Sequence, residues 1–437
     1  MALRIGAAEE SSRRQGAKMA DRNMAMVRRI AAEVARAGGR TYFVGGYVRD
    51  RLLGRENKDV DIEVHGVTVG ALEAILKGFG EMTTMGASFG IMGLRHYDID
   101  IAMPRSEKAT GRGHRDFEVF VDPFIGEEKA AMRRDFTMNA LMQDVLTGEI
   151  LDFFGGQADL AAGRIRHVND ATYAEDPLRV FRAAQFAARF GFEVAGETTA
   201  ISATMDVAAL PRERVMGELE KALIKAARPS IFFVELKKMD RLGHWFGALD
   251  ALPEEAWRRA MARLDAAAAL RREARRPADF MLAAASAGLG APGARRFVNR
   301  LTNAVEATRY VLDMARHLGE LEGFLENDPG EAGWMALFDA TVCPEDLILL
   351  ARAAHTGAAD DWPQTEARLR GLYALYRARM DRPCVMGRDL VEAGVQPGPA
   401  MGRALKYAHG LRLAGADKAA QLQDTLEWLA RGENADD

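Results

Sequence analysis

A short apolar run that stops at two adjacent glycines constrains this chain more than any other feature of its sequence. Residues 41–44 (TYFV) are apolar and partly β-branched, which predicts a buried strand. Gly45 and Gly46 end that strand in a turn, and the apolar spacing of residues 47–53 predicts a helix directly after it. Because glycine lacks a Cβ, backbone N–H groups can line a concavity at the start of this helix. The segment therefore predicts a site for a phosphate group.

Two carboxylates follow in the next apolar run. Asp59 and Asp61 alternate with apolar residues in DVDIEV (residues 59–64), so a strand would place both on one face, about 6–7 Å apart. Such a pair can hold Mg²⁺ together with substrate phosphates, as in two-metal phosphoryl transfer. The alternative is the solvated face of an amphipathic strand, because Asp-x-Asp is common by chance. The glycine pair and Arg-Asp just upstream favour the metal site.

A third carboxylate is expected from a second alternating run at residues 98–103. Asp98 and Asp100 alternate there with isoleucines, and Asp100 is the candidate that we place beside the first pair. Asp98 has the same spacing, and the sequence does not fix the strand register. The choice between the two aspartates therefore stays open at this point.

Arg133, Arg134 and Asp135 lie in a segment with apolar residues at helical intervals. This spacing predicts a helix over residues 129–143, with the three charged residues near its beginning. Taken alone, they are a surface ion-pair group worth under about 1 kcal/mol.

A second helix is predicted to begin at Asp176, an N-cap type of residue, with Pro177 at the first helical position. Arg179 and Arg182 then share one helix face with Asp176, at offsets of three residues. Their plain interpretation is an N-cap followed by two solvated arginines.

Helical spacing also predicts helices over residues 23–37 and 69–76 and a helical chain beyond residue 230, with a basic cluster in residues 271–276 that could contact RNA phosphates. Residues 87–94 are expected to be β-like. Residues 106–117 are rich in glycine and basic residues without an apolar period, which predicts a mobile loop or an exposed hairpin connection.

Composition excludes several classes of protein. The 437 residues suffice for two to four domains, and the net charge of −4 restricts nucleic-acid binding to a local basic patch. Cys343 and Cys384 have no zinc-site spacing and fit a reducing cytoplasm. No signal-like segment and no apolar run of about 18 residues occurs, so we expect neither secretion nor a membrane partner.

Five ordered motifs resemble those of a known family. They are GGYVRD with DVD, RRDFTMNA, the block at 152–160, EDPLRVFR, and the segment 211–223. Together they resemble the bacterial and eukaryotic-type (class II) tRNA nucleotidyltransferases and poly(A) polymerases, within the polymerase-β-like nucleotidyltransferase superfamily. The resemblance covers about residues 41–226. It implies an α+β head, with a small mixed sheet and helices, followed by an all-α neck, body and tail.

The resemblance also implies how the chain is divided. We expect a flexible N-terminal tail, a catalytic head, a neck that recognises the nucleotide base, a helical body, and a helical tail that binds tRNA. Their bounds are 1–22, 23–150, 151–226, 227–330 and 331–437.

The implied activity is untemplated addition of CCA to tRNA 3′ ends from CTP and ATP. Asp59, Asp61 and Asp100 would be catalytic, and the first two would hold two Mg²⁺ ions. Three groups of residues would bind the nucleotide, and the triphosphate would lie at Gly45, Gly46 and Arg49. The ribose motif contains Arg134, Asp135 and Asn139, and a carboxylate there can accept a hydrogen bond from the 2′-hydroxyl. The motif that reads the edge of C or A contains Asp176, Arg179 and Arg182. Gln185 stands where the family usually has a further arginine, so a charge at that position is not expected.

Related activities remain as alternatives. The loop at 106–117 disfavours addition of CC alone, and residues 86–90 (GASFG) lack the arginines typical of bacterial poly(A) polymerases. CCA addition is therefore favoured over A-addition and poly(A) synthesis. An inactive RNA-binding module is the alternative from another class, and the Asp59/Asp61 pair disfavours it. No His-Asp dipeptide occurs, so a metal phosphohydrolase domain is not expected. The sequence leaves the oligomeric state, the tRNAs served and the physiological metal undetermined.

Overall fold

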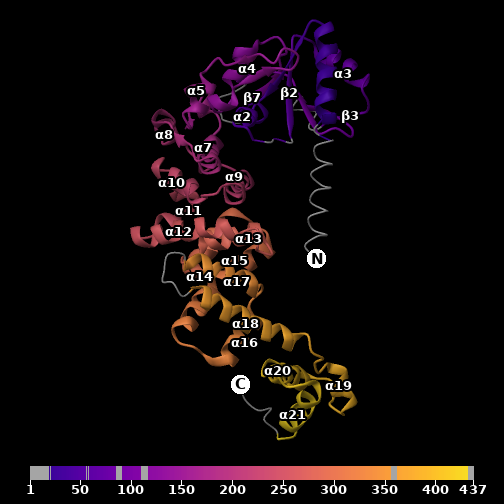
Figure 1. Ribbon diagram of the computed structural model, residues 1–437, viewed down its shortest axis with the longest axis vertical. Coiled ribbons are helices and arrows are strands. Elements are labelled where there is room, and N and C mark those ends of the chain that lie inside the picture. Colours follow the sequence, from indigo (N-terminus) through magenta and orange to yellow (C-terminus); the bar gives the residue numbers. More distant parts are fainter. Residues whose placement is uncertain are drawn as a thin grey trace. The chain divides into compact units, whose positions relative to one another are not determined.

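The computed structural model describes residues 19, 21–55, 57, 59–84, 91–109, 117–355 and 362–431. The chain forms two compact units, Met1–Leu210 with Lys238–Arg241, and Pro211–Lys237 with Leu242–Asp437. All strands of the described residues belong to the first unit, and the second is helical (Figure 1). The predicted fold class, a mixed-sheet head followed by helical domains, is confirmed.

A seven-stranded sheet with the order β3-β4-β5-β2-β1-β8-β9 forms the centre of the first unit. Only the β2–β5 pair is parallel, and the other neighbours are antiparallel. The predicted strands at 41–44 and within 98–103 are confirmed. In the segment 87–94, which was expected to be β-like, residues 91–94 form a strand, and residues 87–90 lie outside the described residues. The strands are β1 (Arg40–Val44), β2 (Val60–His65), β3 (Met82–Thr84), β4 (Ile91–Leu94), β5 (Ile99–Ala102), β8 (Met142–Asp144) and β9 (Ile150–Leu151).

Helices and two smaller β-ribbons complete the first unit. A helix over residues 21–36 confirms the predicted first helix. This helix begins inside the segment 1–22 that was predicted to be a tail, and residues 1–18 and 20 of that segment lie outside the described part. The other elements are α2 (Gly46–Leu52), α3 (Val69–Lys77), α4 (Glu127–Met132), the 3₁₀ helix η1 (Thr137–Asn139), α5 (Gly156–Ala161), α6 (Asp170–Ala174), α7 (Leu178–Phe190), α8 (Gly196–Ser202), the antiparallel ribbon β6 (Arg105–Ala109) with β7 (Phe117–Val121), and the parallel pair β10 (Arg164–Ile165) with β11 (Glu193–Val194).

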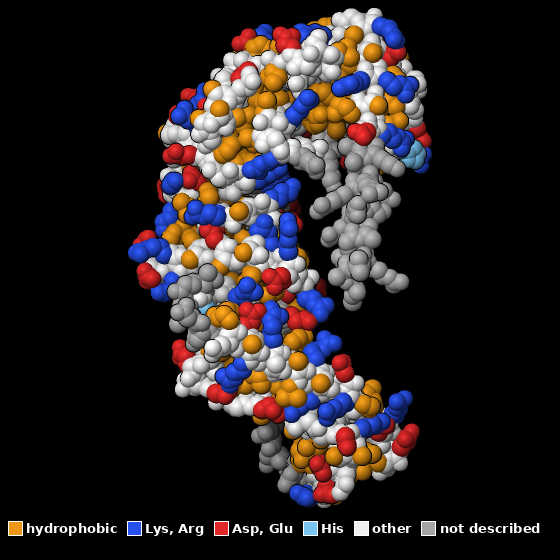
Figure 2. Space-filling view, in the orientation of Figure 1, with side chains coloured by type: hydrophobic (Ala, Val, Ile, Leu, Met, Phe, Trp, Pro, Cys, Tyr) orange, Lys and Arg blue, Asp and Glu red, His pale blue; other side chains and the backbone are white. Residues whose placement is uncertain are grey.

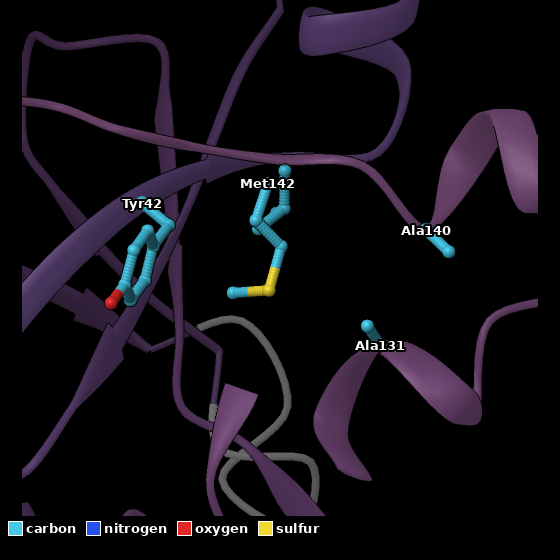
Figure 3. Packing of buried hydrophobic residues seen from close by; sticks show 5 residues of the cluster. Tyr42, Ala131, Ala140 and Met142 are labelled. Carbon is cyan, nitrogen blue, oxygen red and sulfur yellow. The ribbon is translucent and has the colours of Figure 1, made fainter. Parts of the chain in front are cut away.

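One face of the sheet packs on α4 through a small apolar cluster. The cluster contains Tyr42 and Val44 from β1, Met142 from β8, and Ala131 and Ala140 (Figure 3). The β1–β8 register sets Val44 opposite Met142, so both side chains lie on the same face. This packing fixes the segment that follows α4 against the strand that leads into the Gly45 turn.

The predicted helix over 129–143 is wrong. Helix α4 ends at Met132, and the chain continues through η1 into β8. The backbone N–H groups that a longer helix would use have other acceptors: the N–H of Phe136 donates to Oδ1 of Asp135 (2.8 Å) and that of Thr137 to the carbonyl of Arg166 (2.9 Å). Side-chain and tertiary hydrogen bonds thus replace the helical ones.

The predicted loop at 106–117 is shorter than expected. Its flanks pair as the antiparallel ribbon β6–β7, with Arg105 opposite Val121 and Ala109 opposite Phe117. This corresponds to the hairpin alternative for the flanks. Residues 110–116 lie outside the described residues.

The second unit is helical throughout its described part, as predicted for the chain beyond residue 230. No helix among the described residues is long and apolar enough to span a membrane. The helices are α9 (Arg212–Lys225), α10 (Ser230–Lys238), α11 (Gly243–Asp250), α12 (Glu254–Leu270), α13 (Pro277–Ser286), α14 (Gly290–Leu301), α15 (Val305–Glu326), α16 (Gly330–Ala340), α17 (Pro344–Ala354), α18 (Trp362–Met380), α19 (Gly387–Glu392), α20 (Pro399–Leu413) and α21 (Lys418–Ala430).

A buried carboxylate joins three segments of this unit. Asp346 in α17 is fully buried; its Oδ2 accepts from the Tyr310 hydroxyl of α15 (2.6 Å), and its Oδ1 accepts from the N–H of Arg275 (2.8 Å). Burial and the neighbouring Asp346 raise the pKa of Tyr310, so this phenol stays a donor.

We expect Tyr310→Phe to lower the free energy of unfolding of the second unit by about 1–3 kcal/mol, because it leaves a buried carboxylate oxygen without its donor. All five tryptophans lie in this unit, so urea unfolding followed by tryptophan fluorescence measures it selectively. Tyr376→Phe is the matched control, since its hydroxyl donates to the exposed Asp339 (3.2 Å), and we expect a loss below about 0.5 kcal/mol. Equal effects of the two variants would contradict this account.

Candidate active site

The glycine turn has the predicted form of a strand followed by a turn and a helix. Strand β1 ends at Val44, Gly45 is the N-cap with φ 61°, and α2 begins at Gly46. With φ 61° and ψ −125°, Gly45 lies outside the left-handed helical region, so any residue with a Cβ would be strained there. A methyl group added at Gly45 would lie 3.6 Å from Nη1 of Arg134, and one at Gly46 would lie 3.4 Å from Nη2 of Arg49. Two guanidinium groups thus lie beside the turn.

Strand register brings two of the predicted carboxylates together. In the parallel β2–β5 pair, Asp61 lies directly beside Asp100. Asp98 precedes β5, so the register selects Asp100 as the neighbour of Asp61. Asp59 is exposed and directly precedes β2, and its N–H donates to Oδ1 of Asn57 (3.1 Å).

The electrostatics of this group suit a cation. Burial raises the pKa of Asp61, and the negative charges of Asp100 and Asp59 raise it further, whereas Arg134 lowers it. A cation bound among these carboxylates would relieve their repulsion. In the described part of the chain no three His, Cys, Asp or Glu side chains form a complete metal site by themselves. Mg²⁺ needs only one or two carboxylates when substrate phosphates and water supply the other ligands, and Asp61 with Asp100 fits that requirement.

Arg49 is buried rather than open to a ligand. Its exposed fraction is 4%, its Nε donates to Oδ1 of Asp50 (2.8 Å), and its Nη1 donates to Oδ1 of Asn139 (2.7 Å). The rings of Phe186 and Phe190 cover the guanidinium at 5.2 and 4.8 Å. Burial lowers the pKa of Arg49, while Asp50 opposes that effect. Nη2 also lies 2.7 Å from Oδ1 of Asp50, so the charge lies beside the glycine turn with all three guanidinium nitrogens facing protein acceptors.

Asp135 is likewise held by protein partners. Its Oδ1 accepts from the N–H of Phe136 and from Nδ2 of Asn139 (2.9 Å), and its Oδ2 accepts from Nε of Arg182 (2.7 Å). Burial raises the pKa of this carboxyl, but Arg182 and Asn139 outweigh burial and hold the pKa below its usual value. Sequence reasoning placed Asp135 and Arg182 in separate motifs, with roles at the ribose and at the base. The structure joins the two residues as one ion pair between the buried Asp135 and the partly exposed Arg182.

The two residues expected to read the base lie at the start of α7. Oδ1 of Asp176 accepts from the N–H of Leu178 (3.1 Å), but α7 begins at Leu178 with Pro177 as its N-cap, so the predicted N-cap position of Asp176 is wrong by one residue. Nη2 of Arg179 donates to the carbonyl of Arg133 (2.9 Å), and Nη1 donates to the carbonyl of Thr172. Both side chains therefore make hydrogen bonds to the backbone of the first unit.

Glu63 and His65 extend the polar face of β2 and were missed as site residues. Oε2 of Glu63 accepts from Nη2 of Arg134 (2.9 Å), and Oε1 lies 2.9 Å from Nε2 of His65. The period-two alternation that pointed to Asp59 and Asp61 continues to both residues, so the same signal could have found them.

The glycine pair at 155–156 has a structural role. Gly155 adopts φ 76°, and a methyl group at Gly156 would lie 2.3 Å from the carbonyl oxygen of Thr137. The carboxylate of Asp152 accepts from the N–H groups of Gly156 and Gln157 (2.7 and 3.0 Å), which caps α5. The close approach of α5 to η1 thus requires glycine.

The basic cluster lies between α12 and α13, not within one helix as the sequence indicated. Arg275 forms two hydrogen bonds with Glu345 (2.7 and 3.0 Å), and Arg276 pairs with Asp279 (2.6 Å). Figure 2 shows Lys and Arg side chains of the helical unit with Asp and Glu side chains among them. Much of the charge of this cluster is therefore balanced locally.

Comparisons with known proteins agree with this fold. Residues 41–166 match the family model of the poly(A) polymerase head domain. The multifunctional CCA protein of Stenotrophomonas maltophilia is 43% identical over 218 residues, 48% of this chain and 52% of that protein. The multifunctional CCA protein of Cupriavidus metallidurans is 40% identical over 221 residues, with 48% and 52% covered. The chain thus matches about half the length of these curated relatives.

Solved structures match nearly the whole chain. The CCA-adding enzyme of Bacillus stearothermophilus in complex with CTP is 25% identical, with a TM-score of 0.69 and coverage of 93% of this chain and 98% of that one. The CCA-adding enzyme of Thermotoga maritima complexed with tRNA is 22% identical, with a TM-score of 0.66 and coverage of 92% and 95%, and shows the shared fold. The fold defines a nucleotidyltransferase head joined to helical domains. Residues 41–166 match the poly(A) polymerase head-domain family, and the fold of the chain is that of solved CCA-adding enzymes.

We expect Arg182→Ala to lower the free energy of unfolding of the first unit by about 3–5 kcal/mol at neutral pH, because the buried Asp135 loses its cation. Hydrogen–deuterium exchange of peptides from η1 and α7 measures the loss. Arg189→Ala is the control on the same helix. Arg189 lies 3.6 Å from Asp50, and Asp50 still pairs with Arg49 when Arg189 is removed, so the loss of unfolding free energy should be clearly smaller than in Arg182→Ala. A loss in Arg182→Ala no larger than in this control would refute the pairing argument.

The same pair predicts a pH dependence. With Arg182 present, the lowered pKa of Asp135 gives stability that is complete above the unfolded pKa of about 3.9 and is lost as pH falls through the lower folded value. Without Arg182, fewer partners oppose burial, so the pKa of Asp135 is higher than in wild type and protonation relieves the variant as the pH falls. The stability difference between wild type and Arg182→Ala should therefore shrink from pH 7 towards pH 4, and a constant difference would contradict this assignment.

Proposed function

We propose that this chain adds CCA to tRNA 3′ ends from CTP and ATP, without a nucleic-acid template. The observation that carries the proposal is the pairing of Asp61 with Asp100 in a head whose fold matches CCA-adding enzymes. The names of the curated relatives, multifunctional CCA proteins, support it. A-addition alone and poly(A) synthesis are the alternatives within the family.

The reaction forms a bond between the tRNA 3′-oxygen and the α-phosphorus of the nucleotide and breaks the bond to pyrophosphate. Asp59, Asp61 and Asp100 would hold Mg²⁺, with two ions proposed. The bound metal would lower the pKa of the 3′-hydroxyl and neutralise the charge of the leaving group. The N–H groups of the turn at Gly45 and Gly46 would receive the triphosphate, with Arg134 and Arg49 supplying positive charge beside them.

Nucleotide selection is assigned to the segments that follow. Asp176 and Arg179 would form hydrogen bonds to the base edge of C or A, which requires them to exchange backbone partners for the base. The buried group of Asp135, Asn139 and Arg182 would hold the ribose pocket in shape, and direct contact between Asp135 and the 2′-hydroxyl would compete with three existing hydrogen bonds.

The proposal extends to the organisation of the chain. Residues 23–150 would serve as the catalytic head, 151–226 as the neck, and 227–330 and 331–437 as a body and a tail that bind tRNA. Both cysteines are free thiols, which accords with a cytoplasmic location.

Extension assays test the activity directly. Purified protein and Mg²⁺ are incubated with tRNA transcripts that end before CCA, after C and after CC, each with CTP, ATP or both. We expect all three transcripts to be extended to CCA. Extension of only the CC-ended transcript by one A indicates an A-adding enzyme, repeated A-addition indicates a poly(A) polymerase, and no extension favours an RNA-binding module.

We expect Asp61→Ala and Asp100→Ala to reduce extension at least about a hundredfold, because each removes a carboxylate from the proposed metal site. Asp98→Ala is the matched control from the same run of sequence and should stay within about twofold of wild type, since Asp98 is not aligned with Asp61. Loss in Asp98→Ala with activity retained in Asp100→Ala would overturn the assignment.

A further inference from the structure

Glu63 is a buried acid two residues beyond Asp61 on the same face of β2. Its exposed fraction is 7%, and the β1–β2 register sets it opposite Tyr42. One carboxylate oxygen accepts from Arg134, and the other lies 2.9 Å from Nε2 of His65. Glu63 is therefore a buried carboxylate whose two oxygens are held by different partners.

The Arg134 side chain needs such a support. It follows the end of α4 by two residues, and about a third of its surface is exposed. A long, partly exposed arginine loses conformational entropy when it is held in one rotamer. A partner that already holds it in the free protein lowers the entropy cost of ligand binding. Nη2 is held by Glu63, while Nη1 faces Gly45, where a methyl group would lie 3.6 Å away.

The neighbouring carboxylates make this support more important. Nη2 of Arg134 pairs with Glu63, which lies two residues from Asp61 on the same face of β2. Without Glu63, the guanidinium would be drawn towards Asp61 and its neighbour Asp100, since an unpaired charge beside partly buried carboxylates gains the most by pairing with them. Such a pair would move Arg134 away from the glycine turn.

We propose that Glu63 is a positioning residue that holds Arg134 over the Gly45 turn, where its guanidinium meets the triphosphate of the incoming nucleotide. This inference rests on the proposed function. It assigns Arg134 to the phosphates, whereas the family motif suggested a role at the ribose. Glu63 itself touches no substrate and acts through Arg134.

Glu63→Gln tests the proposal, because it keeps the shape of the side chain and removes its charge. We expect the KM for both CTP and ATP to rise about tenfold, the cost of losing one charge-assisted hydrogen bond, with kcat within about threefold of wild type. Nucleotide affinity without tRNA, measured by equilibrium binding of labelled ATP with Mg²⁺, should fall by the same factor. A merely structural role would lower stability or the active fraction and leave KM unchanged.

Two further variants separate positioning from general disruption. Glu127→Gln is the matched control, since its carboxylate accepts from the Tyr42 hydroxyl (2.7 Å) on the same sheet face, and its KM should stay within about twofold. Arg134→Ala should raise KM at least as much as Glu63→Gln, and adding Glu63→Gln to Arg134→Ala should change nothing more. If Glu63→Gln does not fold, Glu63→Asp keeps the charge but withdraws it by one methylene, and the same rise in KM is expected.

Other results would overturn the proposal. A Glu63→Gln enzyme with unchanged KM beside an impaired Arg134→Ala enzyme shows that Glu63 does not position Arg134, and so do additive effects of the two changes. A wild-type chain that extends no tRNA refutes the proposed function instead. In that case ATP binding still decides the role of Glu63, because Glu63→Gln must weaken that binding if Arg134 meets the phosphates.

Discussion

The parallel pairing of β2 with β5 is the constraint on which the rest of the site depends. It aligns Asp61 with Asp100, while β1 on the other side of β2 ends at the Gly45 turn. The intervening side chains of Val60, Ile62 and Ile101 are buried. A slip of one residue would send every carboxylate to the apolar face, so core packing fixes the register and thereby the geometry of the acidic group.

The side chains around the glycine turn form a chain of buried polar contacts. Arg49 joins Asp50 to Asn139, and Asn139 in turn donates to Asp135. Asp135 then pairs with Arg182 of α7, so one continuous network runs from α2 to α7. Buried ion pairs add little net stability compared with well-packed apolar residues, but removing one member is costly. This network therefore ties the helix after the glycine turn to the segment that follows Asp176.

Arg134 differs from Arg49 in how its charge is used. Arg49 is enclosed by aromatic rings and protein acceptors, whereas Arg134 has one supported nitrogen and a partly exposed guanidinium. Both lie beside the same turn. The buried Arg49 is fixed within the protein, whereas the guanidinium of Arg134 stays partly open to solvent. An arginine count in the sequence does not reveal this difference, because it depends on the acceptors that surround each side chain.

Local sequence signals determined much of this protein. The glycine pair, the alternating strands and the helical character of the second unit each follow from spacing and residue type within a few neighbours. The order of the motifs indicated the same head domain as the family match over residues 41–166. The helix expected over 129–143 failed because Asp135 and Arg166 took over the hydrogen bonds of Phe136 and Thr137.

Tertiary structure alone decided which residues became partners. Asp100 rather than Asp98 lies beside Asp61 because strand register is set by packing on both faces of the sheet. The pairs Asp135–Arg182 and Glu63–Arg134 join residues 47 and 71 positions apart. No local periodicity encodes such contacts, since they exist only once the sheet, η1 and α7 have packed together.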